Sequence, residues 1–141
     1  DLPVKTTAEL VDYAKKNPGK LNYAEASASQ RLSGEMFNKL AGVKIERVPY
    51  KASPQALGDV ASGQVQVMFP DLPQALTQIE AGRVRGLATT GPKRTTVTPN
   101  LPAIAEAVPG YSLVYWLAER FRFAPARVAD LRVDLERALA G

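Results

Sequence analysis

The stretch GKLNYAEASASQRLSGEMFNKLAGVKIERVPYKASPQALGDVASGQVQVMF, residues 19–69, alternates runs of helical spacing with short β-rich runs. Glycine adopts the left-handed conformation that ends a helix without a Cβ penalty. It ends the helical runs at Gly19, Gly42, Gly63 and Gly82. The runs that follow have strand length and composition, over 21–24, 43–48, 65–69 and 84–88. This repeat predicts an α/β fold in three layers, with a mostly parallel sheet and helices on both faces.

Local signals predict where three helices begin. Thr6 and Glu9 have the spacing of a capping box, which starts the first helix. The polar turn Ser27–Ala28–Ser29 is expected to open the second helix. Ser53 is expected to cap the third helix, with Pro54 at its first helical position.

Apolar spacing indicates which helix faces are buried. The expected inward residues are Leu32, Met36, Phe37 and Leu40 in the second helix, and Leu57, Val60 and Ala61 in the third. Further along we expect a helix with Leu76 and Ile79, a short helix near Ile104, a β-rich run over 112–117 and a last helix over 127–140. No linker interrupts the repeat, so we expect one domain, residues 1–141.

The composition limits the chemistry. The chain has 141 residues, 45% of them hydrophobic, which suffices for one domain with a core. It contains no cysteine and no histidine, which excludes thiol nucleophiles, thiolate or imidazole metal sites and the usual general base. The sequence also lacks a nucleophile–base pair and a glycine-rich phosphate loop. We therefore expect no enzymatic activity, no metal and no cofactor.

The net charge of +4, from 18 Lys and Arg against 14 Asp and Glu, suits an anionic partner. Its distribution argues against nucleic acid, because the basic residues are scattered among acids and no aromatic ladder accompanies them. The densest basic clusters are the pairs Lys15–Lys16 and Lys93–Arg94. Small anions therefore remain the expected partners.

Six short motifs, in order, carry a resemblance to a known family. They are PGKLNYA (18–24), GEMF (34–37), VPYK (48–51), GQVQVMF (63–69), LPQAL (72–76) and PGY (109–111) ahead of Trp116. With these motifs the chain resembles the second lobe of the extracytoplasmic solute receptors of tripartite tricarboxylate transporters, the Bug family. The resemblance covers residues 1–116, whereas 117–141 is an altered carboxyl-terminal segment with its own expected helix.

The resemblance implies a function. Family receptors are two-lobed periplasmic clamshells that hold a small carboxylate and deliver it to membrane transporter subunits. This chain is therefore expected to resemble one lobe of a periplasmic binding protein, with the partner lobe missing. The expected function is an extracytoplasmic solute-binding lobe for small carboxylates that feeds such a transporter. The alternative is a single-lobe structural or interaction module that self-associates and has lost ligand transport.

The turn 27–29 and the backbone amides up to Arg31 form the first candidate site. They lie between the carboxyl end of a strand and a helix amino terminus, where free N–H donors and the helix dipole suit an anion. In the family the corresponding loop helps to grip the ligand carboxylate. The resemblance thus implies contacts from Ser27, Ala28, Ser29 and Gln30, with Arg31 as charge partner. Ordinary helix capping by the two serines is the alternative.

Three further residues, Tyr50, Lys51 and Asp71, follow expected strands and lie where open parallel sheets collect ligands. Asp71 stands one position after the place where the family commonly has an acidic residue, here Pro70. The alternatives are a helix-start role for Asp71 and a solvated loop charge for Lys51.

Aromatic residues near the end of the chain predict association. With the partner lobe absent, an exposed aromatic patch is expected to find a partner. Its members are Tyr115, Trp116, Phe121 and Phe123. We therefore expect a homo-oligomer, by exchange of the last helix between two copies, or a separate partner lobe.

Overall fold

The structure, a computed structural model, describes residues 2–112, in which helices and strands alternate as predicted up to α4 (Leu72–Glu80). The elements in chain order are α1 (Thr7–Lys16), β1 (Asn22–Glu25), α2 (Ala28–Ala41), β2 (Glu46–Pro49), α3 (Ser53–Ser62), β3 (Val67–Met68), α4 (Leu72–Glu80) and α5 (Ile104–Ala107). The predicted run over 112–117, the last helix and the aromatic patch lie outside the described residues, apart from Ser112. One domain over 1–141 therefore stays a prediction.

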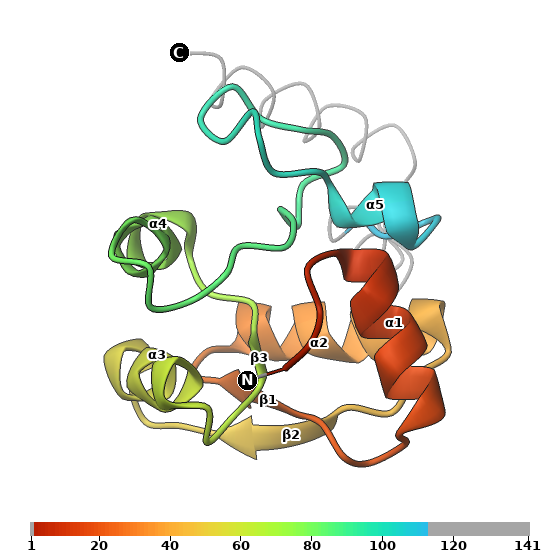
Figure 1. Cartoon of the computed structure of the whole chain (residues 1–141), viewed down its shortest axis with the longest axis horizontal. Helices are drawn as coiled ribbons and strands as arrows, with labels where there is room; N and C mark the ends of the chain where they lie inside the picture. Colours follow the sequence, from red (N-terminus) through yellow and green to blue (C-terminus); the bar gives the residue numbers. More distant parts are fainter. Residues whose placement is uncertain (1, 113–141) are drawn as a thin grey trace.

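The three strands form a parallel sheet in the order β2-β1-β3 (Figure 1). β1 is central, and Tyr23 in it pairs with Arg47 of β2 on one side and Val67 of β3 on the other. All three carboxyl ends therefore lie at one edge of the sheet. The predicted α/β class with a mostly parallel sheet is confirmed.

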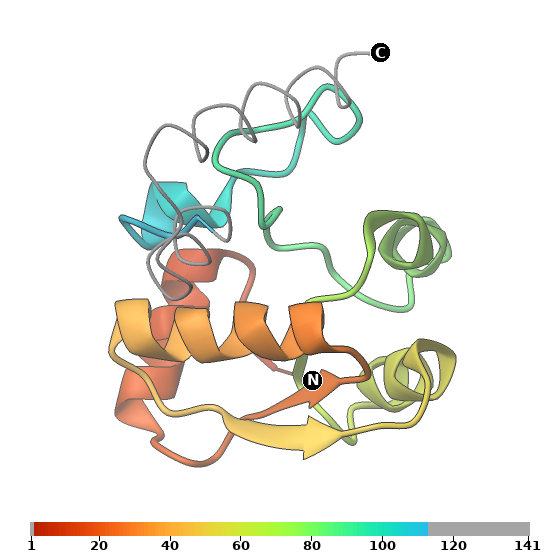
Figure 2. The ribbon, with the colours of Figure 1, turned by 180° about the vertical axis from the view of Figure 1, so that it is seen from behind.

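Two hydrophobic clusters cover the two faces of the sheet. Successive side chains of a strand point to opposite faces, and Tyr23 and Ala24 belong to different clusters. Tyr23 packs with Met36 and Phe37 of α2, which runs along the sheet in Figure 2. The smaller cluster joins Ala24 to Ala56 of α3 and to Val65. Helices thus pack on both faces, as predicted.

The helix ends are where the sequence signals were strongest. Gly42 and Gly63 end α2 and α3 with φ angles of 64° and 82°. These left-handed conformations are strained for residues with a Cβ. At α1 the Thr6 side chain accepts from Glu9 N as predicted, but the Glu9 carboxylate accepts from Lys5 N, so the capping box is shifted by one residue.

β2 and β3 start later than predicted, and a side-chain amide bonds to the backbone near the start of each. Asn38 donates to Ile45 O at 2.8 Å and accepts from Ile45 N at 3.1 Å. The backbone groups of Ile45 are thereby taken, and β2 begins at Glu46. Before β3, Gln66 Oε1 accepts from Asn22 N at 3.0 Å, and β3 spans only two residues.

The strand predicted over 84–88 is wrong. The structure shows no strand there, and pairing is limited to one bridge between Thr89 and Ala103. Leu87 and Ala88 instead pack against the main hydrophobic cluster. The β-rich composition therefore reflects apolar packing and not a ladder of hydrogen bonds.

Three predictions within the helices also need correction. Ala52, not Ser53, is the N-cap of α3, and Ser53 is its first helical residue. Leu40 is 40% exposed, because the buried face of α2 includes the small residues Ser33 and Gly34 instead. On α3 the buried residue next to Leu57 is Ala56, and Ala61 is exposed.

Candidate functional site

The candidate site lies at the edge where the three strands end. From β1 the chain passes through α2 to β2, which pairs with one side of β1. β3 pairs with the other side of β1. The loops after β1 and β3 therefore flank the point where the strand order reverses, which is where open α/β sheets bind ligands. All the predicted site residues lie in the loops at this edge or in the first turn of α2.

Ser27 is the N-cap of α2, in agreement with the capping alternative for this turn. Its Oγ accepts from Gln30 N at 3.4 Å and lies 3.0 Å from the Oγ of Ser29. The N–H groups of Ala28 and Ser29 have no acceptor among the described residues, and residues 27–29 are exposed. Capping therefore occupies one donor of the helix terminus and leaves two donors beside two hydroxyls, in an exposed turn.

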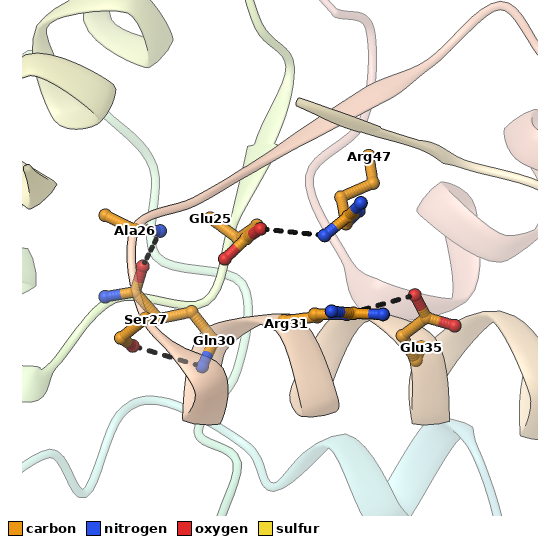
Figure 3. Close-up of polar contacts among 7 residues, drawn as sticks. All are labelled: Glu25, Ala26, Ser27, Gln30, Arg31, Glu35 and Arg47. Carbon is orange, nitrogen blue, oxygen red and sulfur yellow. Dashed lines mark hydrogen bonds and ion pairs between the residues drawn. The ribbon is translucent and has the colours of Figure 1, made fainter. Parts of the chain in front are cut away.

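Gln30 differs from its neighbours because its side chain is buried, with 2% of the residue exposed. Its Oε1 accepts from Ala26 N at 2.8 Å, and its Nε2 donates to Ser53 Oγ at 3.1 Å (Figure 3 shows the Ala26 contact). Both polar ends are thus engaged inside the protein. This link between the starts of α2 and α3 was not predictable from sequence, since it joins residues 23 positions apart.

Charged side chains pair next to this turn (Figure 3). Arg31 and Glu35 approach to 3.9 Å along α2, and both are exposed. Glu25, whose side chain is 12% exposed, pairs with Arg47 across β1 and β2 at 3.1 Å. Sequence reasoning missed the Glu25–Arg47 pair; the only signal was an acid at the end of one strand and a base in the next.

Tyr23 of β1 is buried, and the charges of both pairs act on its hydroxyl. Burial, followed by the negative charge of Glu35, raises the pKa of Tyr23 to about 12. Its hydroxyl is buried and has no hydrogen-bond partner among the described residues. The neutral phenol is therefore the form that the fold stabilises.

The loop after β2 is tied to β1 and to α3. Tyr50 N donates to Glu25 O at 2.7 Å, and Tyr50 Oη donates to Asp59 Oδ2 at 2.8 Å. That hydrogen bond raises the pKa of the Tyr50 phenol. Lys51 is exposed at the tip of this loop. The structure thus brings Tyr50 and Lys51 to the same edge as the turn 27–29.

Asp71 is the N-cap of α4, in agreement with the helix-start alternative, but its side chain makes no capping hydrogen bond. It is exposed and follows β3 by three positions. Its carboxylate therefore remains available at the edge of the sheet.

The chemistry of this edge is that of binding. Amide N–H groups, hydroxyls and the cations Arg31 and Lys51 suit a small anion. Among residues 2–112 no group of three or more acidic side chains could hold a metal ion. Within the same residues no helix is long and apolar enough to cross a membrane.

Known protein sequences and structures resemble this chain. The model of the family described as "Tripartite tricarboxylate transporter family receptor" matches residues 1–138. A UPF0065 protein from the tcbD–tcbE intergenic region of a Pseudomonas species is 32% identical over 149 residues, covering 99% of this chain and 44% of that protein.

Two solved structures from Rhodopseudomonas palustris share the fold. One, solved with adipate, has a TM-score of 0.77 and 42% identity over 79% of this chain and 38% of its own. The other, MatC with bound malate, has a TM-score of 0.72 and 28% identity over 79% of this chain and 39% of its own. The chain spans less than half the length of each of these three relatives.

Proposed function

Because the chain belongs to the tripartite tricarboxylate transporter receptor family, we propose that it binds a small carboxylate in the periplasm and delivers it to the membrane subunits of such a transporter. The family is one of solute-binding receptors and not of enzymes. Since this chain spans 38% of the adipate-bound relative, it supplies one wall of the proposed site.

The observation that carries the proposal is the exposed amino terminus of α2. Two backbone N–H groups without acceptors among the described residues, those of Ala28 and Ser29, lie beside two hydroxyls. A carboxylate oxygen accepts from such donors, and the positive end of the helix dipole favours its charge. The adipate and malate bound to the two structural relatives support this ligand class.

We assign the roles as follows. Ser27, Ala28 and Ser29 donate hydrogen bonds to one ligand carboxylate. Arg31 and Lys51, both exposed, supply the positive charge that attracts it. Asp71 would repel a second carboxylate placed beside it and would accept a hydrogen bond from a ligand hydroxyl.

The remaining assigned residues act from the interior of this wall. Tyr50 lines it with its ring, since its hydroxyl is held by Asp59. Gln30 acts indirectly, because its backbone N–H donates to Ser27 Oγ and its buried side chain accepts from Ala26 N. A single wall buries only part of a ligand, so we expect weak affinity for this chain without the rest of the receptor.

The test is a titration of the ¹⁵N-labelled chain with adipate and with malate, followed by amide chemical shifts at constant ionic strength. We expect saturable shifts at residues 27–31, 50–51 and 71, and none with the uncharged adipamide. Ser29→Ala should weaken the response. Ser62→Ala, which removes a hydroxyl bonded to Asp59 O, should not. Shifts that fail to saturate, or that adipamide reproduces, would refute the proposal.

A further inference from the structure

The buried side chain of Gln30 joins two loops of the proposed site. One end holds the amide of Ala26, directly before the capping serine, and the other end holds the hydroxyl of Ser53, at the start of α3. The contacts measure 2.8 and 3.1 Å, and only 2% of Gln30 is exposed. Such a side chain cannot reach a ligand in solvent while it keeps both bonds.

The link fixes how the two loops lie relative to each other. Ala26 precedes the turn 27–29, whose residues are exposed. Ser53 follows Tyr50 and Lys51 by two to three positions. The Tyr50 N bond to Glu25 O, 2.7 Å long, ties the same two loops one step further into the sheet. Without the Gln30 bonds, the two loops would still be joined by the Tyr50–Glu25 bond but would lose their link nearer the site.

We propose that Gln30 is the positioning residue of the site: it holds the anion-binding turn 27–29 in register with the loop 50–51 and does not touch the ligand. This inference rests on the proposed function and adds to it the source of the site's preorganisation. A binding surface that is already ordered loses less entropy when the ligand arrives. The amide of Gln30 suits this role, because one end accepts and the other donates.

Gln66 provides a matched control. It also uses both ends of its amide, since Oε1 accepts from Asn22 N at 3.0 Å and Nε2 donates to Gly63 O at 3.2 Å. Its bonds lie at the amino ends of the strands, on the edge opposite the site. Replacing Gln66 therefore removes an amide that also makes two hydrogen bonds, but at a place where no ligand is proposed to bind.

The experiment compares Gln30→Met with Gln66→Met, because methionine keeps the length and removes both polar groups. Hydrogen exchange of the Ala26 amide and the adipate titration are measured on each. We expect Gln30→Met to speed Ala26 exchange about tenfold and to weaken adipate binding about fivefold, the loss of roughly one hydrogen bond. Gln66→Met should change neither.

A third variant, Gln30→Glu, separates geometry from charge. A carboxylate still accepts from Ala26 N, and the Ser53 hydroxyl can turn to donate to it. Ala26 protection should therefore return toward that of the wild type, while the added negative charge keeps adipate binding weak. Restored protection in Gln30→Glu would show that the two hydrogen bonds, and not the amide group itself, order the turn.

The outcomes are distinct. Wild-type binding with unchanged affinity in Gln30→Met overturns the positioning role and leaves the proposed function standing. Ala26 exchange that is unchanged in Gln30→Met overturns the role as well, as does an equal loss of affinity in Gln66→Met. A wild-type chain that shows no saturable titration overturns the proposed function and the positioning role with it.

Discussion

The ring of Tyr23 lies directly against Gly34, so that a Cβ atom on Gly34 would come 2.6 Å from Tyr23 Cζ. This contact between β1 and α2 is possible only where α2 carries no side chain. Both residues are buried, and Tyr23 also packs edge-on against Phe69 at 6.2 Å between ring centroids. The ring therefore has little room to move away.

Gly34→Ala should destabilise the protein. Overpacking at a buried contact outweighs the gain in helix propensity, and we expect a net loss of about 1–2 kcal/mol in the free energy of unfolding. Urea unfolding followed by circular dichroism measures it. Gly58→Ala is the control, because a Cβ there meets nothing within 4 Å, and it should add about 0.5–1 kcal/mol. Equal effects of the two substitutions would contradict the contact.

Two tyrosine hydroxyls should respond oppositely to removal. Tyr111 Oη donates to Ser33 O at 3.2 Å, whereas Tyr23 Oη is buried without a partner among the described residues. Tyr111→Phe should cost about 1 kcal/mol of stability, while Tyr23→Phe should be neutral or stabilising, because it removes an unsatisfied polar group. Thermal unfolding of both variants decides this. A loss at Tyr23 equal to that at Tyr111 would show that its hydroxyl has a bonding partner.

The sequence predicted elements well where the signal is local. The left-handed glycines and the Ser27 cap depend on neighbouring residues only, and the structure bears them out. The Gln30–Ser53 link, in contrast, depends on where the sheet places two loops, so no local pattern announces it. The strand predicted over 84–88 is wrong for the same reason. Leu87 and Ala88 pack against the main hydrophobic cluster, and no neighbouring strand pairs with them.

In the candidate site, too, local features were predictable from sequence and contacts between distant residues were not. Residues 27–29 were predictable, because a capping serine after a strand marks a helix amino terminus. The pair Glu25–Arg47 and the bond from Tyr50 to Asp59 were not, since each requires the parallel register or the fold of a neighbouring helix. Sequence therefore located the donors, and the fold supplied what holds them.

Stability should fall in alkaline solution. Burial raises the pKa of Tyr23 and of Tyr111 from 10.0 to about 12. Between these values the unfolded chain loses phenol protons that the folded chain keeps, so the stabilisation is complete below pH 10 and is lost as the pH rises through about 12. Urea midpoints across this window measure the slope. The double variant Tyr23→Phe with Tyr111→Phe should show a shallower decline, and an unchanged slope would contradict the shifted values.

The last prediction separates the two roles of Ser27. Its Oγ caps α2 by accepting from Gln30 N, just as the Thr6 side chain caps α1 by accepting from Glu9 N. Ser27→Ala and Thr6→Ala should therefore each lower stability by about 1 kcal/mol. Only Ser27 lies beside the exposed amides of the proposed site, so only its loss should weaken adipate binding, by about fivefold. Isothermal unfolding and the amide-shift titration, run on both variants, give the comparison. If both variants lose the same stability and both bind adipate like the wild type, Ser27 is only a helix cap. Removing a hydroxyl that contacts the ligand would lower the affinity.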